Sequence, residues 1–332
     1  MKKQITQSDI AKLANVTRQT VSLVLNNDPR VNSDTRTKIL KIMDELGYQP
    51  NTMARNLASR SSKTIGFHFF DLEWESFSQP VFSDGLAGIY FRANELGYSI
   101  KLYRLETDQD YAAPFRSGDI DGAIFVTYDK KQIEERLIPL LDKGFPIVVI
   151  GSHEEFPRVS IDHRTGVRIG TEHLISKRKK RILYLGGDLE YRSNEIKYES
   201  FQKTLQTAGS PHNSDLAKHN LYLTPHGYDA VKEALKKEPD FNAVFAAVND
   251  QVALGALGAL KEAGIRIPGQ IPVIGYDDSK YAHCSIPALS TVHVPFYNMG
   301  RTAMDLIAEY IDTEETPESK VLSPEMIIRN TG

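Results

Sequence analysis

From Thr64 onward, short apolar runs rich in β-branched and aromatic residues alternate with segments of helical periodicity. Buried parallel strands are typically continuous apolar runs, because helices cover both faces of their sheet. The alternation therefore predicts parallel α/β structure for most of the chain. The runs lie at residues 65–70, 99–103, 122–126, 146–151, 181–187, 243–248 and 271–276.

The number of these runs is too large for one ordinary sheet, and the alternation pauses near residues 152–163, with a short strand near 159–162. We therefore expect two similar α/β lobes. No period of 20–50 residues repeats along the chain, which argues against a solenoid. The helices between the strands are expected near residues 82–97, 130–143, 164–176, 194–208 and 250–263.

The first part of the chain differs, because two short amphipathic helical patterns flank a tight turn at residues 15–17. Thr17 in this turn can cap the second helix through its hydroxyl. The buried face of the first helix is expected to comprise Ile10, Ala11, Leu13 and Ala14. The buried face of the second helix is expected to comprise Val21, Val24 and Leu25.

The second helix leaves Arg18, Gln19, Ser22 and Leu23 on its outer face. Arginine and glutamine at the start of a helix can make paired hydrogen bonds to guanine and adenine edges in the major groove. These residues predict a recognition helix. The alternative is a three-helix module that docks onto another protein.

The runs DIAKLANVTRQTVSLVLN and VNSDTRTKILKIMDELGYQPNTMARNLA resemble the DNA-binding headpiece of the LacI/GalR family of bacterial transcription regulators. The run AAVNDQVALGALGALKEAGIRIPGQIPVIGYDDSKYAHCSIPALSTV resembles the family's effector-binding body, which has the periplasmic-binding-protein type I fold. The resemblance implies a small all-α helix-turn-helix headpiece at residues 1–49 and a hinge at 50–61. A two-lobed α/β effector-binding and dimerisation body would then occupy residues 62–332.

In the family's body the chain crosses between the lobes three times. The resemblance therefore places residues 62–160 and 295–320 in the first lobe, and 161–292 and 321–332 in the second.

Residues 50–61 are too short to form a stable helix alone, although Asn51 can cap one and Ala54 and Leu57 share a face. The resemblance implies a hinge helix that orders on DNA, with Leu57 inserted as an apolar wedge in the minor groove. The alternative is a plain linker. Because one headpiece covers a half-site only, a homodimer on a pseudo-palindromic operator is expected.

Polar residues around the helix-turn-helix and the hinge are the candidate DNA contacts, although several threonines and serines can equally serve as caps. Leu23 departs from the arginine of many relatives and offers apolar contact only. The candidates are Thr6, Ser8, Thr17, Arg18, Gln19, Thr20, Ser22, Leu23, Asn26, Arg30, Asn51, Ala54, Arg55 and Leu57.

Ligands of open α/β sheets bind at the carboxyl ends of the strands. The resemblance assigns effector contact to Asp277 and Asn249, and Lys197 stands where relatives usually have an arginine. A turn role for Asp277, a cap role for Asn249 and a surface role for Trp74 are the alternatives. The effector candidates are Phe70, Asp71, Trp74, Tyr128, Arg192, Ser193, Lys197, Tyr222, Asn249 and Asp277.

The charge is distributed unevenly along the chain. Residues 1–63 hold 11 Lys and Arg against five Asp and Glu, a net charge of +6. The remainder holds 29 against 38, a net charge of −9. A basic N-terminal unit beside an acidic body predicts that nucleic acid binds the N-terminal unit.

Other features predict no further chemistry. No apolar run is long enough to span a membrane, the N-terminus lacks a secretory signal, and the single cysteine, Cys284, fits a reducing cytoplasm. The basic run at residues 177–181 is expected to be a solvated loop, and His212, His219 and His226 are not expected to bind metal. The Gly186-Gly187 pair lacks the dinucleotide-binding continuation, and no HExxH, GxSxG or P-loop pattern appears. No cofactor and no enzyme activity are therefore expected.

These observations predict a cytoplasmic, dimeric transcription regulator. We expect it to act as a repressor and to be controlled by a sugar-like effector that binds between the lobes. One alternative effector is a purine or nucleoside acting as co-repressor. The rival functions are a solute-binding protein with no DNA role and a doubly wound enzyme. Steep salt dependence of DNA binding would argue against a solute-binding protein with no DNA role. Turnover of a candidate ligand by residues 62–332 would support an enzyme.

Overall fold

The structure is a computed structural model. It describes residues 5–25, 28–48, 61–70, 80–105, 110–126, 133–210, 213–236 and 241–332. The chain divides into two compact units, Met1–Ser62 and Lys63–Gly332.

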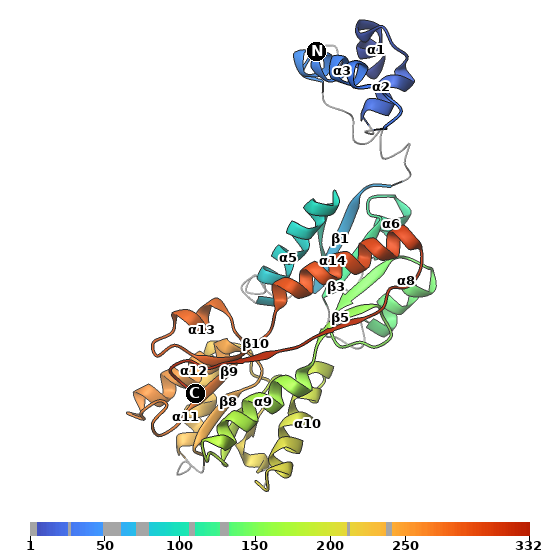
Figure 1. Ribbon diagram of the computed structural model, residues 1–332. Coiled ribbons are helices and arrows are strands. Elements are labelled where there is room, and N and C mark those ends of the chain that lie inside the picture. The colour runs from blue at the N-terminus through green and yellow to red at the C-terminus, as the bar shows by residue number, and fades with distance from the viewer. Residues whose placement is uncertain are drawn as a thin grey trace. The chain divides into compact units, whose positions relative to one another are not determined.

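The first unit contains three helices, α1 (Gln7–Ala14), α2 (Arg18–Leu25) and α3 (Ser33–Glu45) (Figure 1). Side chains cap each helix start, which satisfies backbone N–H groups that lack a helical partner. Thr6 and Asp9 form a reciprocal capping box on α1. The Thr17 hydroxyl accepts from the Thr20 N–H at 3.1 Å, and Asn32 accepts from the Thr35 N–H at 2.8 Å.

The core of this unit joins all three helices. Its buried members are Ile10, Ala11, Ala14, Val21, Val24, Ile39 and Met43. The prediction that Leu13 is buried was wrong, because its side chain is 59% exposed. Ile10 and Ala14, four residues apart, form the buried stripe of this two-turn helix, and Leu13 falls beside that stripe.

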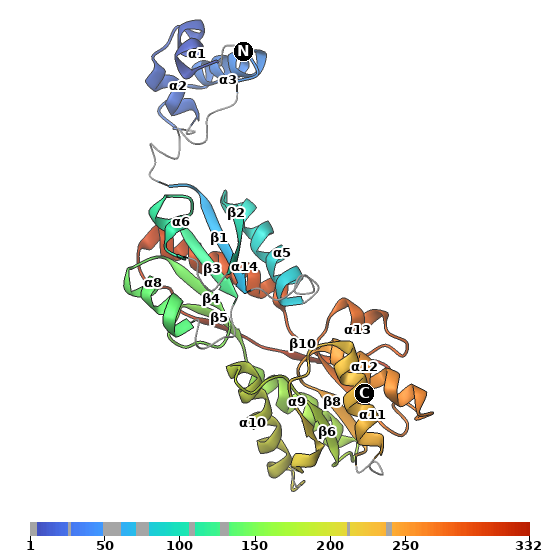
Figure 2. The same cartoon turned by 180° about the vertical axis from the view of Figure 1, so that it is seen from behind.

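The second unit contains two six-stranded sheets with matching topology (Figures 1 and 2). The first sheet is parallel throughout and has the order β11-β5-β4-β3-β1-β2. Its strands are β1 (Thr64–Phe70), β2 (Ser99–Leu105), β3 (Gly122–Val126), β4 (Ile147–Ile150), β5 (Arg158–Ile161) and β11 (Lys320–Leu322).

The second sheet has the order β12-β10-β9-β8-β6-β7 and is parallel except where β10 pairs with β12. Its strands are β6 (Ile182–Leu185), β7 (Ala217–Lys218), β8 (Ala243–Ala246), β9 (Val273–Asp277), β10 (Ser290–His293) and β12 (Glu325–Ile327). The predicted fold class, a small helical unit followed by a two-lobed α/β body, is confirmed.

Helices cover both faces of each sheet. In the first lobe these are α5 (Pro80–Leu96), α6 (Ala113–Arg116), the π-helical turn η2 (Ile133–Leu137), α8 (Ile138–Asp142) and α14 (Phe296–Thr313). In the second lobe they are α9 (His163–Ser176), α10 (Arg192–Thr207), the 3-10 turn η3 (Ser214–Leu216), α11 (Thr224–Lys236), α12 (Asp250–Glu262) and α13 (Lys280–Cys284).

Two helix pairs meet backbone to backbone at glycines. A Cβ atom on Gly300 of α14 would lie 2.0 Å from the Gly85 carbonyl oxygen of α5, and one on Gly88 would lie 2.0 Å from the Tyr297 oxygen. In the second lobe, a Cβ on Gly255 of α12 would lie 1.9 Å from the Thr224 oxygen of α11. These separations leave no room for a methyl group between the paired helices.

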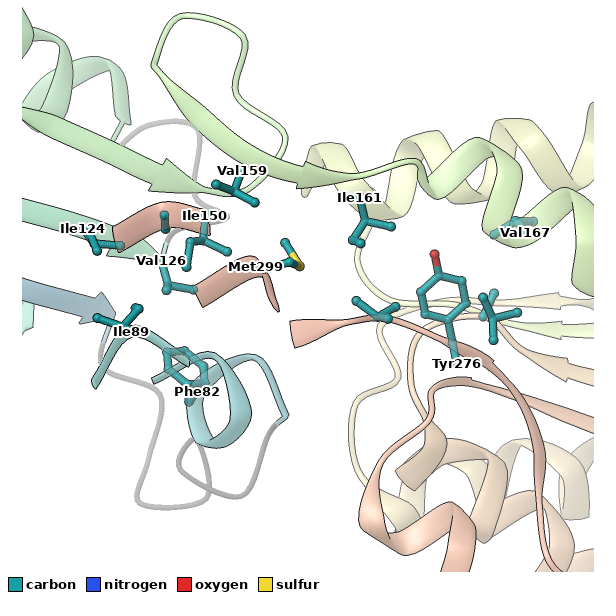
Figure 3. Packing of buried hydrophobic residues seen from close by; sticks show 14 of the residues in the cluster. Phe82, Ile89, Ile124, Val126, Ile150, Val159, Ile161, Val167, Tyr276 and Met299 are labelled. Carbon is teal, nitrogen blue, oxygen red and sulfur yellow. The ribbon is translucent and has the colours of Figure 1, made fainter. Parts of the chain in front are cut away.

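The described residues pass between the sheets three times, from β5 to α9, from β10 to α14 and from β11 to β12. One hydrophobic core includes residues of both sheets. Figure 3 shows Ile161 and Met299 between residues of the first sheet, such as Val126, and Tyr276 of the second. The crossings therefore run beside a shared apolar core.

Most predicted strands and helices are present within one or two residues of their expected ends. The predicted helix near 130–143 is a π-helical turn followed by α8, and residues 130–132 lie outside the described residues. The sequence did not predict α6, α11, α13, α14, β7, β10, β11 or β12. Pro225 stands in the first turn of α11, where proline is tolerated, so this helix forms although proline usually interrupts helices. Among the described residues, no helix has both the length and the apolarity to cross a membrane.

His68 is buried in the middle of β1, with its ring stacked between Tyr103 at 4.6 Å and Phe125 at 4.5 Å. Neither ring nitrogen has a hydrogen-bond partner within the part of the chain that the structure describes. Burial lowers the pKa of His68 to about 3, because no charged group stabilises the imidazolium.

This burial predicts that His68 contributes to acid sensitivity. An unfolded chain binds a proton at this histidine below about pH 6.5, whereas the folded chain does not until about pH 3. The free energy of unfolding should thus fall as the pH falls, by about 1.4 kcal/mol per pH unit from this residue. Between pH 6.5 and pH 5, the free energy of unfolding of His68→Phe should therefore fall by about 2 kcal/mol less than that of the wild type. Urea unfolding at the two pH values measures this difference. An unchanged pH slope would contradict the prediction.

Candidate DNA-binding and effector sites

The second helix of the first unit presents polar side chains at its start. Thr17, Arg18 and Gln19 are exposed, whereas Val21 and Val24 hold the opposite face in the core. The Arg18 guanidinium approaches Gln7 of α1 at 3.4 Å, a weak bond that leaves most of its donors available. The arrangement matches the geometry by which a recognition helix meets base edges.

Several other DNA candidates have structural partners in this structure. Thr6 is the cap of α1, and Thr17 is the cap of α2. Arg30 makes a paired bond to the Asp28 carboxylate, at 2.9 Å from Nε and 2.7 Å from Nη2. Ser8 is exposed, and Thr20, Ser22 and Leu23 are half-buried. Asn26, Asn51, Ala54, Arg55 and Leu57 lie outside the described residues.

Arg36 is a structural residue of this unit that the sequence argument did not identify. Its Nη2 donates to the Asp28 carbonyl oxygen at 2.6 Å, and its Nη1 is 3.5 Å from the Val24 oxygen. Arg36 therefore joins α3 to the segment that follows α2. Its position in an ordinary charged helix gave no sequence signal for this role.

In the second lobe, polar residues meet at the carboxyl ends of β6, β8 and β9. We call Lys197, Tyr276, His163, Asn249 and Asp277 the carboxyl-end cluster. Lys197 of α10 is 6% exposed. Its Nζ lies 3.9 Å from the centre of the Tyr276 ring and 3.4 Å from the Val248 carbonyl oxygen. The Tyr276 hydroxyl and His163 Nδ1 are 3.1 Å apart.

Burial dominates the electrostatics of this cluster. It lowers the pKa of Lys197 to about 8, and the charge of Asp277 offsets part of this effect. Burial also raises the pKa of Asp277 well above its ordinary value, opposed by the charge of Lys197. Burial and the Lys197 charge together lower the pKa of His163 well below its ordinary value. At pH 7 the cluster therefore holds an ammonium beside a neutral imidazole.

Asp277 has a backbone φ of +111° at the end of β9. Its side chain is half-buried, and within the described residues no hydrogen bond or ion pair reaches its carboxylate. A carboxylate held in this way keeps its acceptor capacity for another molecule.

Asn249 has a structural role in addition to its place in the cluster. Its side-chain oxygen accepts from the Val252 N–H at 3.0 Å and so caps α12. Its amide donates to the Tyr222 carbonyl oxygen at 2.9 Å. One amide hydrogen remains for a ligand.

The neighbouring Asp250 is almost fully buried, and it holds the loop after β9. Its carboxylate accepts from the Thr291 hydroxyl at 2.6 Å and from the Ser279 N–H at 2.7 Å. Burial raises its pKa to about 6, although these bonds oppose the shift.

The remaining effector candidates of the second lobe lie near the start of α10. Arg192 is exposed and pairs with Glu195 at 2.6 Å, and Ser193 is half-buried. The Tyr222 hydroxyl accepts from the Asp188 N–H at 2.8 Å. In this structure the partners of Arg192 and Tyr222 are other protein groups, so ligand contact by these residues stays a prediction.

The first-lobe candidates cannot be placed in the same way. Phe70 is the last residue of β1. Asp71, Trp74 and Tyr128 lie outside the described residues. The side of the site formed by the first lobe therefore remains a prediction.

One further feature, a surface cavity, lies away from the carboxyl-end cluster. A surface cavity of about 340 Å³ in the first lobe is lined by Asp110, Tyr111, Glu135, Arg136 and Lys143 among others. In the described residues, no group of His, Cys, Asp and Glu side chains could hold a metal ion.

Sequence reasoning missed His163 as a member of the cluster. Tyr276 was nominated by its place at the carboxyl end of an apolar strand, but its contacts with His163 and Lys197 were not expected. His163 starts α9, far from Lys197 in the sequence. No local pattern predicts their contact, because the folding of two separate segments creates it.

The helix-turn-helix unit followed by a two-lobed α/β body defines a class of ligand-responsive DNA-binding proteins. Residues 6–51 match the family described as bacterial regulatory proteins, lacI family, and residues 171–331 match a periplasmic binding protein-like domain. The chain is 31% identical over 338 residues to the transcriptional repressor PurR of Vibrio parahaemolyticus, covering 98% of each chain. The chain belongs to the lacI family of bacterial transcription regulators.

Other relatives agree with this assignment. Catabolite control protein A of Priestia megaterium is 29% identical over 331 residues, which cover 97% of each chain. A lac repressor dimer bound to operator and an anti-inducer has a TM-score of 0.84 at 27% identity, covering 99% of each chain. A complex of the regulator CelR with cellobiose has a TM-score of 0.75 at 27% identity, covering 99% of this chain and all of the other.

Proposed function

We propose that this protein is a dimeric repressor in the cytoplasm that releases or grips its operator in response to a polyhydroxylated small molecule, of the sugar class. The first unit reads the operator through α2, and residues 50–61 order on DNA as a hinge. The ligand binds at the carboxyl-end cluster between the lobes. It acts through a difference in affinity for two lobe arrangements.

The observation that carries this proposal is a carboxyl group, for which the described residues provide no hydrogen-bond donor, beside a buried ammonium. Among the residues that the structure describes, none donates a hydrogen bond to the Asp277 carboxyl group, and Lys197 has weak partners for its three donors. Two neighbouring hydroxyl groups suit both, because one donates to the carboxylate and the other accepts from the ammonium. Each burial cost is then offset by a hydrogen bond.

A purine or nucleoside is the second candidate ligand. Relatives named PurR are similar over the full chain, and a purine edge also offers a donor beside an acceptor. Lys197 lacks the planar fork with which an arginine pairs or stacks on a flat ring, so the sugar class is favoured.

Fluorescence anisotropy with an operator selected by the protein itself from random duplexes tests the proposal. The titrants are cellobiose, other mono- and disaccharides, uronic acids, nucleosides and purine bases. We expect one sugar to change operator affinity at least about tenfold, a coupling of about 1.4 kcal/mol. Asp277→Asn should lose the response and keep the DNA affinity, whereas Glu172→Gln on the exposed face of α9 should keep both. If no titrant has an effect at saturation, ligand control of this kind is wrong.

The dimer proposal rests on exposed apolar side chains of the second unit. Tyr90 and Phe91 on α5 are 53% and 55% exposed, and Tyr281 and Ile286 at α13 are 46% and 90% exposed. Helices α5 and α13 lie on the same side of the unit in both views (Figures 1 and 2). Large apolar groups exposed together on one side favour contact with a second copy of this chain.

Charge placed in this surface should separate the subunits. A Phe91→Asp, Tyr281→Asp double variant should sediment at the 37.3 kDa of one chain, and the wild type at about twice that mass. Val321→Asp is the control, because Val321 is 57% exposed on β11, at the far edge of the first sheet. A dimeric double variant would contradict this interface.

A further inference from the structure

The last residue of β9 and the residue that follows it both have a positive backbone φ. The φ angle is +111° at Asp277 and +58° at Asp278. Residues with a Cβ atom adopt such angles at a cost of about 1 kcal/mol or more each. Contacts around the pair must therefore hold it in place.

The side chain of Asp278 is the main anchor of this pair. It is 10% exposed, and Arg329 Nη2 donates to its Oδ1 at 2.6 Å. His293 Nδ1 lies 3.0 Å from its Oδ2. We call Asp278, His293 and Arg329 the clamp. The backbone N–H of Asp278 also points to the Thr291 hydroxyl at 3.4 Å.

Both partners of Asp278 stand next to chain crossings between the lobes. His293 is the last residue of β10, and the crossing to α14 follows it directly. In that crossing the Val294 N–H donates to the Asp277 carbonyl oxygen at 3.3 Å. Arg329 follows β12, after the crossing from β11, and its Nη1 donates to the Leu289 oxygen at 2.9 Å.

The charges of the clamp support one another. Burial alone would raise the pKa of Asp278, but the bonds from His293 and Arg329 outweigh it and lower the pKa below its ordinary value. The bond to Asp278 in turn raises the pKa of His293. The other charged groups near His293 are Glu325 of β12, which also raises this pKa, and Arg329, which lowers it. His283 of α13 lies 3.4 Å from the Asp278 carboxylate.

We propose that Asp278 is a positioning residue, which holds Asp277 in its left-handed conformation and ties it to the second and third lobe crossings. Movement of Asp277 by a ligand then acts on Val294 and Arg329 without passing through the rest of the second lobe. The inference rests on the proposed ligand contact of Asp277. It adds the route by which that contact reaches the lobe arrangement.

The test measures lobe arrangement without any ligand. Spin labels are placed at Ser117 after α6 and at Lys236 at the end of α11, in full-length Cys284→Ser protein diluted with unlabelled chains. Both label positions are exposed, one in each lobe. Pulsed electron paramagnetic resonance gives the interlobe distance distribution, and nuclear magnetic resonance of the histidine ring gives the His293 titration.

Glycine and asparagine both adopt a left-handed φ readily, so Asp278→Gly and Asp278→Asn remove the charged anchor and keep the backbone conformation accessible. We expect either variant to widen the interlobe distribution about twofold, since the crossings lose a shared tie. In Asp278→Asn the pKa of His293 should fall toward its ordinary value of about 6.5. Glu172→Gln, which removes one charge of the exposed Arg168–Glu172 pair in the same lobe, should leave both readouts unchanged.

A wild-type distribution in folded Asp278 variants would overturn the proposal, since a purely local stabilising role changes unfolding and leaves the interlobe distance unaltered. If these variants fail to fold, His293→Gln decides the matter. His293 is 38% exposed, so its replacement is compatible with folding, and an unchanged distribution there would also overturn the proposal. No ligand enters these measurements. Failure of the proposed ligand control and failure of the proposed role of Asp278 can therefore be told apart.

Discussion

Gly255→Ala is expected to destabilise the second unit by about 3 kcal/mol or more, near the upper end for overpacked sites. The added methyl would lie 1.9 Å from the Thr224 carbonyl oxygen and 2.6 Å from the Tyr228 nitrogen, both backbone atoms of α11. A backbone cannot rotate away as a side chain can, so α11 and α12 must separate. Their separation would open the apolar core between them. Urea unfolding followed by circular dichroism measures the loss.

The same helix offers a matched control. A Cβ on Gly258 would meet one atom, the Tyr228 ring carbon, at 3.6 Å, which is ordinary contact. Gly258→Ala should therefore be neutral, or stabilising by up to about 1 kcal/mol through helix propensity. Similar losses in both variants would show that the close helix contact is not the cause. In the first lobe, Gly88→Ala and Gly85→Ala form the same kind of pair, at 2.0 and 3.8 Å.

Arg18→Ala is expected to weaken operator binding by about 1–3 kcal/mol for each half-site, because arginine at the start of a recognition helix pairs with a guanine edge. Arg18 is exposed and weakly bound to Gln7 at 3.4 Å, so its removal leaves the core of the first unit intact. Gln19→Ala should act similarly at an adjacent base. Anisotropy titrations against the selected operator and against single-base variants measure both effects.

Lys41→Ala supplies the control for these substitutions. Lys41 is 76% exposed on α3 and lies 3.9 Å from Glu45, a surface pair worth less than about 1 kcal/mol. Its loss should barely change operator affinity. If Arg18→Ala weakens binding equally for every DNA sequence, Arg18 contacts phosphates and not bases.

Strong local periodicity explains which parts of the fold could be predicted. The apolar runs at β3 and β4 and the capped helices of the first unit are encoded in adjacent residues. By contrast, β10 is a four-residue polar-containing strand, and its place beside β9 depends on distant packing. The return of residues 295–320 to the first lobe was expected from family resemblance alone, because periodicity does not show which sheet a segment packs against.

The candidate site shows the same division. Lys197, Asn249 and Asp277 could be proposed because the carboxyl ends of parallel strands converge. The stacking of Lys197 on Tyr276 and the anchoring of Asp278 by Arg329 could not, because these contacts join segments far apart in sequence. Likewise, Leu13 was expected inside because apolarity alone does not show which side of a short helix faces the core.

The packing of α14 against α5 has a consequence for synthesis on the ribosome. The first lobe begins near Lys63, yet its glycine-lined helix contact and its edge strand β11 come from residues 296–322. A nascent chain that stops before Phe296 therefore leaves the matching face of α5 and part of the sheet open to water. We infer that this lobe completes its folding only after nearly the whole polypeptide has emerged from the ribosome. The first unit, whose three helices are consecutive in sequence, can fold as soon as it has emerged.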